Sequence, residues 1–306
     1  MYKVLCLNNI SQKGLSRLTP EFSITEDISE ADAIIVRSAN LHDVEIPDNI
    51  KVIARAGAGY NNIPTAALAE RGIPVFNTPG ANANAVKELV ICGMLLAARD
   101  VVGGIEWCKA NADDENIAKS AETAKKQFAG TEIIEKTVGV IGLGAIGKLV
   151  VKSCEALGMK VYGYDPYLPE EAAAAISESM VFTDKLEDIY ANCNYITIHV
   201  PAMEGTIGMI DEAAINQMQD GVVFLNFSRD TLVDAAAMTE GLAKGKVGKY
   251  VTDFATPAVM GMTNTIVLPH LGASTAEAEE NCAIIAVEDV MHFLKTGERR
   301  HCVNMK

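Results

Sequence analysis

The stretch VGVIGLGAIGKLVVKSCEALGMKVYGYD, residues 138–165, contains the pattern that decides the fold. An apolar run leads into the motif G-x-G-x-x-G at 142–147, a helical pattern follows, and a second apolar run ends at Asp165. The glycines permit a tight turn and close approach of a ligand to the backbone, while the following helix directs its N-terminus at a pyrophosphate. This strand–turn–helix–strand unit predicts dinucleotide binding.

Asp165 indicates which dinucleotide is bound. A carboxylate at the end of the second strand accepts hydrogen bonds from ribose hydroxyls, and it would repel a 2′-phosphate. The next residues, PYLPEE (166–171), include no cation. NAD is therefore predicted rather than NADP. Besides Asp165, the residues of the turn predicted to contact it are Gly142, Gly144, Ala145, Ile146 and Gly147.

Apolar runs alternate with helical patterns on both sides of this motif. Such runs are typical of parallel strands whose two faces are both covered. A long buried helix is predicted at 81–100, a protruding excursion or inter-subunit arm at 111–136, and a last helix from a cap at Ser274 to a stop at Gly297. The predicted strands are 3–10, 33–38, 51–57, 74–79, 136–142, 160–165, 195–200, 222–228, 249–254 and 265–270. The last six predict a doubly wound parallel sheet of Rossmann type in an α/β protein.

Composition excludes several classes of protein. The 306 residues carry a net charge of −14, which argues against nucleic acid or an anionic membrane as partner. The seven cysteines form no C-x-x-C pair, so we expect reduced thiols and no metal site. The start of the chain has no secretory signal pattern, and the longest apolar runs are too short to span a membrane. We expect a cytoplasmic protein.

Eight segments occur in an order that resembles one enzyme family. They are RSAN (37–40), RAGAGYNNI (55–63), NTPGANANAVKELV (77–90), GLGAIG (142–147), HVPAMEGTIGMI (199–210), LNFSRDTLVD (225–234), TDF (252–254) and PHLGAST (269–275). Together they resemble the NAD-dependent D-2-hydroxyacid dehydrogenases, and among these the phosphoglycerate dehydrogenases most.

The resemblance implies an architecture of two domains. A Rossmann domain, residues 96–284, would be inserted into a smaller flavodoxin-like α/β substrate-binding domain formed by 1–95 and 285–306. It also implies a homodimer that pairs through the nucleotide domain, with the excursion around 107–128 as the interlocking region. Because the sequence ends at HCVNMK, we expect no C-terminal regulatory domain.

The family transfers a hydride between NAD and C2 of a 2-hydroxy or 2-oxo acid. Reducing the ketone requires a cation for the carboxylate and the developing oxyanion, and a proton donor for that oxygen. Arg229 matches the family's arginine and His270 its acid/base histidine. Further positions that match cofactor contacts are His199, Val200, Pro201, Thr206, Phe227, Ser228, Asp253 and Gly272.

The sequence departs from the family beside the histidine. The family's glutamate is missing from TDFATP (252–257), and Asp230 stands where the family usually has glycine. Our hypothesis is that Asp230, or with less support Asp253, orients His270. The alternative is that Asp230 pairs with Arg229 or caps the next helix, and that His270 works through water.

Two arginines indicate the substrate. Arg37 and Arg55 end consecutive predicted strands and resemble the phosphate-contacting arginines of phosphoglycerate dehydrogenases, although each could be an ordinary ion-pair residue. Lys87 adds charge or lies on a helix surface. The substrate-binding residues implied by the resemblance are Arg37, Ser38, Arg55, Ala58 and Gly59.

We therefore expect oxidation of 3-phosphoglycerate to 3-phosphohydroxypyruvate for serine biosynthesis. The alternative enzyme reduces hydroxypyruvate, glyoxylate or another small 2-oxo acid. An alternative of another class is a non-catalytic, NAD-sensing interaction protein, which only the missing glutamate favours.

Overall fold

The computed structural model describes residues 1–305, which form two compact α/β units. The N-terminal unit comprises Met1–Ala85 together with the chain from Ala273 onward, and the central unit comprises Val86–Gly272. The domain boundaries expected from the sequence were residues 95 and 284. The units of the structure divide after residues 85 and 272, which lie 10 and 12 residues earlier. Each unit contains one sheet that is parallel throughout, so the two-unit α/β fold is confirmed.

The N-terminal unit has a five-stranded sheet with the order β2-β1-β3-β4-β5. This order is the flavodoxin-like one, in which the chain reverses direction between the first and third strands. The strands are β1 (Tyr2–Leu7), β2 (Phe22–Thr25), β3 (Ala33–Val36), β4 (Val52–Arg55) and β5 (Val75–Phe76). The helices are α1 (Gln12–Leu15), η1 (Ile28–Glu30), α2 (Thr65–Glu70) and α12 (Ala276–Thr296).

Helices cover both faces of this sheet, because alternate side chains of each strand enter different cores. Ile35 and Ala54 pack with the apolar face of α12, whereas Ile34 and Ile53 pack on the opposite side with Leu68 of α2. Burial on both faces explains why these strands are continuous apolar runs.

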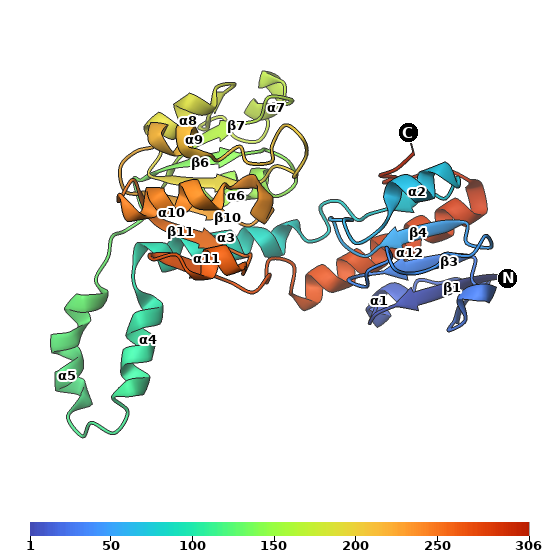
Figure 1. Cartoon of the computed structure of the whole chain (residues 1–306), viewed down its shortest axis with the longest axis horizontal. Helices are drawn as coiled ribbons and strands as arrows, with labels where there is room; N and C mark the ends of the chain where they lie inside the picture. The colour runs from blue at the N-terminus through green and yellow to red at the C-terminus, as the bar shows by residue number, and fades with distance from the viewer. Residues whose placement is uncertain (306) are drawn as a thin grey trace. The chain divides into compact units, whose positions relative to one another are not determined.

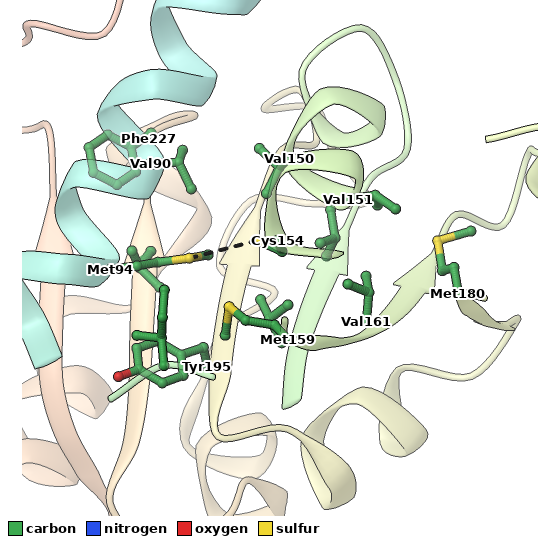
Figure 2. Packing of buried hydrophobic residues seen from close by; sticks show 14 of the residues in the cluster. Val90, Met94, Val150, Val151, Cys154, Met159, Val161, Met180, Tyr195 and Phe227 are labelled. Carbon is green, nitrogen blue, oxygen red and sulfur yellow. Dashed lines mark hydrogen bonds between the residues drawn. The ribbon is translucent and has the colours of Figure 1, made fainter. Parts of the chain in front are cut away.

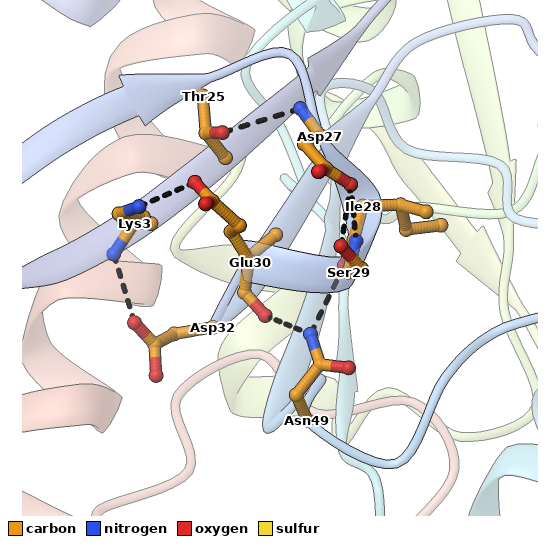
Figure 3. Close-up of polar contacts among 9 residues, drawn as sticks. Lys3, Thr25, Asp27, Ile28, Ser29, Glu30, Asp32 and Asn49 are labelled. Atoms are coloured by element: carbon orange, nitrogen blue, oxygen red, sulfur yellow. Dashed lines mark hydrogen bonds and ion pairs between the residues drawn. The ribbon is translucent and has the colours of Figure 1, made fainter.

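Polar groups close the edge of this sheet where the strands begin (Figure 3). Asp32 accepts the backbone N–H of Lys3 at 2.8 Å and pairs with Lys51 at 2.8 Å. Asn49 donates to the carbonyl oxygens of Ile28 and Ala31, at 3.0 and 2.6 Å. The opposite edge, at the carboxyl ends of the strands, carries Arg37 and Arg55.

The central unit has a seven-stranded sheet with the order β12-β11-β10-β9-β6-β7-β8. Figure 1 labels β6, β7, β10 and β11 of this sheet. The chain reverses between β6 and β9, which gives the doubly wound Rossmann topology expected from the sequence. The strands are β6 (Thr137–Ile141), β7 (Lys160–Tyr164), β8 (Val181–Thr183), β9 (Tyr195–Ile198), β10 (Val222–Asn226), β11 (Val247–Thr252) and β12 (Thr265–Val267).

One face of this sheet packs against α3 (Ala83–Ala98) and α6 (Gly147–Ala156), as Figure 2 shows. Met94 and Cys154 meet there with their sulfur atoms 3.9 Å apart. The other face is covered by α8 (Leu186–Asn192), α9 (Glu212–Gln217) and α10 (Ala235–Ala243). The remaining short helices of the unit are α7 (Glu170–Ala174), η3 (Asp230–Leu232) and α11 (Pro257–Met260).

The polar segment expected as an excursion is a helical hairpin of the central unit (Figure 1). It consists of α4 (Val101–Ala110) and α5 (Ile117–Ala124), followed by η2 (Lys125–Phe128). The hairpin therefore begins about ten residues before the predicted segment, with the apolar sequence of α4.

Two strands and one helix cap differ from the sequence expectations. The short edge strands β2 and β8 were not predicted, because FSIT and VFT are brief and partly exposed. The cap of α12 is Thr275 rather than Ser274: the Thr275 hydroxyl accepts the N–H of Ala278 at 3.1 Å. The helix ends at Gly297, whose φ of 75° is left-handed, as expected. Within residues 1–305, no helix is long and apolar enough to cross a membrane.

Candidate active site

The glycine-rich turn between β6 and α6 has room for a ligand at one glycine only. A Cβ on Gly142, whose φ is 94°, would lie 2.9 Å from the His199 carbonyl group, and one on Gly147 would lie 1.9 Å from the Gly142 oxygen. A Cβ on Gly144 would meet nothing within 4 Å. The first and third glycines are thus required by the turn, and the second leaves the backbone open to a phosphate group. Gly144 and Ala145 are exposed, while Ile146 packs into the core.

Asp165 lies directly after β7 and is tied to this turn. Its carboxylate accepts the N–H of Leu143 and the N–H of Tyr167, both at 3.0 Å. A carboxylate has about four acceptor sites, so the two oxygens retain capacity for ribose hydroxyls. The turn and the acidic residue therefore form one hydrogen-bonded unit that fits an adenosine diphosphate group.

His199 lies beside the turn, directly after β9. Its backbone N–H donates to Ile141 at 2.7 Å, and its Nε2 lies 3.0 Å from the Thr197 hydroxyl. The Nδ1 atom is buried and has no hydrogen-bond partner among the described residues. Burial lowers the pKa of His199 to about 3, so the imidazole is neutral at physiological pH.

The loop after His199 is closed by hydroxyl groups. Thr206 donates to the carbonyl oxygen of Pro201 at 2.5 Å, and Ser228 donates to that of Val200 at 2.6 Å. Phe227, expected at the cofactor, is buried in the core against α3. These contacts hold the 199–206 loop against the end of β10.

Arg229 lies in a turn that is built by a residue the sequence analysis did not identify. The fully buried Asn226, the last residue of β10, donates its side-chain N–H to the carbonyl oxygen of Arg229 at 2.8 Å and accepts the N–H of Ser228 at 3.1 Å. The guanidinium donates to the Ser228 carbonyl oxygen at 2.6 Å. An asparagine at the end of an otherwise apolar strand was the available signal, because asparagine is depleted in strands.

His270 lies at the same edge of the sheet in a left-handed backbone conformation, with φ of 58°. Asp253 holds it there: the Asp253 carbonyl oxygen accepts the N–H of His270 at 3.0 Å. The buried Asp253 carboxylate accepts the N–H groups of Leu271 and Gly272, both at 2.7 Å. The ring of Phe254 packs edge-on against the imidazole, with centroids 5.3 Å apart.

The Arg229 turn and the His270 loop are connected through β10 and β11. The backbone N–H of Asp253 donates to the carbonyl oxygen of Asn226 at 3.2 Å. Asn226 thus holds Arg229 with its side chain and Asp253 with its backbone. A guanidinium and an imidazole at one edge of a sheet can bind a carboxylate and move a proton.

Asp230 is exposed and begins η3. It lines a pocket of about 290 Å³ together with Tyr250 and Phe254, the same Phe254 that packs against His270. Asp253, the second candidate partner of His270, uses each of its two carboxylate oxygens for a backbone N–H.

Apart from Lys87, the remaining predicted residues belong to the N-terminal unit. The Nε of Arg55 donates to the Arg37 carbonyl oxygen at 3.1 Å, and a Cβ on Gly57 would lie 1.7 Å from the Arg55 Nη1. The Ser38 N–H donates to Asn8, and the Ala58 carbonyl oxygen accepts from Asn77. Gly59 follows in the same turn. Lys87 belongs to the central unit, and its Nζ lies 3.6 Å from the Oε1 atom of Glu88.

Comparison with known proteins shows one family. Residues 92–272 match the model described as "D-isomer specific 2-hydroxyacid dehydrogenase, NAD binding domain". A D-3-phosphoglycerate dehydrogenase of Archaeoglobus fulgidus is 36% identical over 292 residues, which cover 92% of this chain and 53% of that protein. The chain thus spans about half the length of the curated phosphoglycerate dehydrogenases it matches.

Two further relatives match at nearly full length. A hydroxypyruvate reductase of Thermotoga maritima is 36% identical over 279 residues, covering 87% of this chain and 86% of that protein. The solved structure of an NAD⁺-bound 3-phosphoglycerate dehydrogenase of Entamoeba histolytica has a TM-score of 0.80 at 25% identity, covering 99% of this chain and 98% of that one.

Replacing Asp253 by asparagine should loosen the His270 loop. The two N–H groups are accepted by different carboxylate oxygens, and asparagine has an NH2 donor in place of one of them, so a buried, charge-assisted hydrogen bond is lost and we expect a cost of about 2 kcal/mol in the free energy of unfolding. Amide hydrogen exchange at Leu271 and Gly272 should accelerate. Asp220→Asn, at an exposed surface carboxylate, is the control; equal exchange in the two variants would contradict the role of Asp253.

His199 should make the protein sensitive to acid. Its pKa is lowered to about 3 in the folded state, so between pH 6.5 and 3 the unfolded chain binds a proton that the folded chain does not. Stability is therefore lost as the pH falls through this window, by up to about 1.4 kcal/mol per pH unit. Urea unfolding from pH 6.5 to 4.5 should show a smaller loss for His199→Asn than for the wild type; identical losses would mean that His199 is protonated in the folded protein.

Proposed function

The chain belongs to the D-isomer-specific 2-hydroxyacid dehydrogenase family, and on this premise we propose that it transfers a hydride between NAD and C2 of a D-2-hydroxy acid. The substrate we propose is 3-phosphoglycerate, oxidised to 3-phosphohydroxypyruvate for serine biosynthesis in the cytoplasm. The observation that carries this choice is the pair of guanidinium groups of Arg37, directly after β3, and Arg55, the last residue of β4, in a protein of net negative charge. Arginine binds phosphate with a fork of donors.

The residues that would hold NAD fit it. The open face of Gly144 and the N-terminus of α6 suit the pyrophosphate, and Asp165 suits the adenosine ribose. No cation follows Asp165 in residues 166–171, which favours NAD over NADP. NAD, when held by these residues, would supply the acceptor for the hydride from C2. Because burial keeps the His199 imidazole neutral, this side chain places no positive charge beside the glycine-rich turn.

Arg229 and His270 carry the proposed chemistry. The Arg229 guanidinium binds the substrate carboxylate and stabilises charge on the C2 oxygen. His270 takes the hydroxyl proton during oxidation and returns it during reduction. Asn226 and Asp253 act as positioning residues, because they hold the two backbone segments on which these side chains lie.

Hydroxypyruvate reduction is the second candidate function. It is favoured by the Thermotoga maritima hydroxypyruvate reductase, which this chain matches along most of both lengths. Substrates of that class carry no phosphate, so the two candidates differ in what they require of Arg37 and Arg55.

Substrate preference tests the proposal. NADH oxidation should be faster with phosphohydroxypyruvate than with hydroxypyruvate, glyoxylate or 2-oxoglutarate. Arg37→Ala should raise KM for phosphohydroxypyruvate about ten-fold or more and leave KM for hydroxypyruvate nearly unchanged, because a charged hydrogen bond contributes about 1.5–3 kcal/mol. Preference for an unphosphorylated acid would establish the second candidate. Binding of NADH without turnover of any acid would indicate a non-catalytic protein.

We also propose that Asp230 orients His270. The support is that Asp230 lines a pocket together with Phe254, whose ring packs against His270, and that the family glutamate is absent from residues 252–257. Asp230→Asn should lower kcat about ten-fold and, with 3-phosphoglycerate and NAD in the oxidation direction, move the acid limb of the pH profile to lower pH, because a carboxylate stabilises the protonated imidazole. Asp220→Asn is the matched surface control. Full activity with an unchanged profile would assign Asp230 to the turn alone.

We propose a homodimer that pairs through the α4–α5 hairpin. An apolar pocket of about 460 Å³ lies between the two helices and η2, and Val101, Val102 and Ile105 are each about half exposed. Exposed apolar clusters of this kind mark association surfaces.

Introducing a charge into the hairpin should therefore give monomers. Light scattering after gel filtration should report a dimer for the wild type and a monomer for Ile105→Glu, because the new carboxylate would be desolvated at the interface. Ile24→Glu, at a similarly exposed apolar position on β2, should remain dimeric. A dimeric Ile105→Glu would place the interface elsewhere.

A further inference from the structure

Arg37 has an acidic partner in the N-terminal unit: its Nη2 forms an ion pair with Glu279 Oε1 at 2.6 Å. The two residues are 242 positions apart in sequence and meet because α12 packs on the sheet that ends in Arg37. Both side chains are partly exposed, at 35% and 40%. The pair therefore lies where a ligand from solvent can reach it.

Both arginines face the same end of α12. Cys282 follows Glu279 by one turn on this helix, and burial raises the pKa of its thiol, while Arg55 and Arg37 act to lower it. Glu279 thus belongs to the same electrostatic environment as the two guanidinium groups. Its carboxylate offsets the positive charge of Arg37, with which it is paired.

We propose that Glu279 is a specificity-determining residue, which competes with the substrate's phosphate for Arg37. This inference rests on the proposed function, in which Arg37 and Arg55 bind that phosphate. A phosphate monoester carries a charge of about −1.5 to −2 at pH 7, so the Glu279 carboxylate repels it. To bind Arg37, the phosphate must displace this carboxylate from the guanidinium. An unphosphorylated 2-oxo acid has no group to place there.

The competition has a consequence for selectivity. Without Glu279, the Arg37 guanidinium would lose its ion-pair partner and would bind small phosphates, including inorganic phosphate, more readily. When Glu279 is present, the Arg37 guanidinium is held by an ion pair. This pair contributes only a small free energy, because both side chains are partly exposed to solvent. A ligand that also makes contacts elsewhere displaces the carboxylate more readily than free phosphate does.

The test compares Glu279→Gln with Glu280→Gln. Glu280 is the next residue of α12 and pairs with Lys13 at 2.5 Å, so its variant removes the same charge from the same helix turn. For Glu279→Gln we expect KM for phosphohydroxypyruvate to fall about three-fold, with kcat and KM for hydroxypyruvate unchanged. Inorganic phosphate should raise the thermal midpoint of this variant more than that of wild type. Glu280→Gln should match the wild type in all these measurements.

A double-mutant comparison separates this inference from the proposed function. If Glu279 acts through Arg37, the Glu279→Gln effect disappears in the Arg37→Ala background. Suppose that Arg37→Ala raises KM for phosphohydroxypyruvate, but Glu279→Gln neither lowers this KM nor increases the rise in thermal midpoint caused by inorganic phosphate. The role of Glu279 is then overturned and the substrate assignment stands. If Arg37→Ala leaves KM unchanged, the phosphate site itself is overturned.

Discussion

The buried carboxylate of Asp253 is the interaction on which the candidate active site depends. Burying a charge is costly unless it is hydrogen-bonded, and each carboxylate oxygen of Asp253 accepts one backbone N–H at 2.7 Å. Its own backbone connects β10 to the His270 loop through Asn226. Two polar side chains at the ends of neighbouring strands thus determine the paths of both segments that carry the proposed chemistry.

The glycine-rich turn follows the same principle of backbone control. Two of its glycines are imposed by contacts with His199 and with the turn itself, and only Gly144 faces open space. Asp165 then fixes the turn by accepting the N–H of Leu143. The side chains that would recognise a dinucleotide therefore also shape the protein around it, so their replacement affects folding and binding together.

Much of this arrangement was predictable because it depends on local patterns. The motif at 142–147 with Asp165 predicted the Rossmann sheet, and apolar runs predicted strands covered on both faces. What could not be predicted depends on tertiary contacts. The role of Asn226 requires knowing that its side chain turns back to Arg229, and the pairing of Arg37 with Glu279 exists only because α12 lies on the sheet. The strands β2 and β8 were missed because brief, exposed edge strands lack a strong apolar pattern.

The left-handed backbone of His270 has a consequence for how this protein can change. Its backbone N–H donates to the carbonyl oxygen of Asp253, a contact that does not depend on which side chain stands at position 270. Asparagine and glycine adopt the same left-handed conformation readily, so either can occupy position 270 and keep this hydrogen bond. If His270 has the proposed acid/base role, such an exchange would separate hydride transfer from cofactor binding: the fold would remain a scaffold that can hold a dinucleotide, a single substitution away from the proposed enzyme.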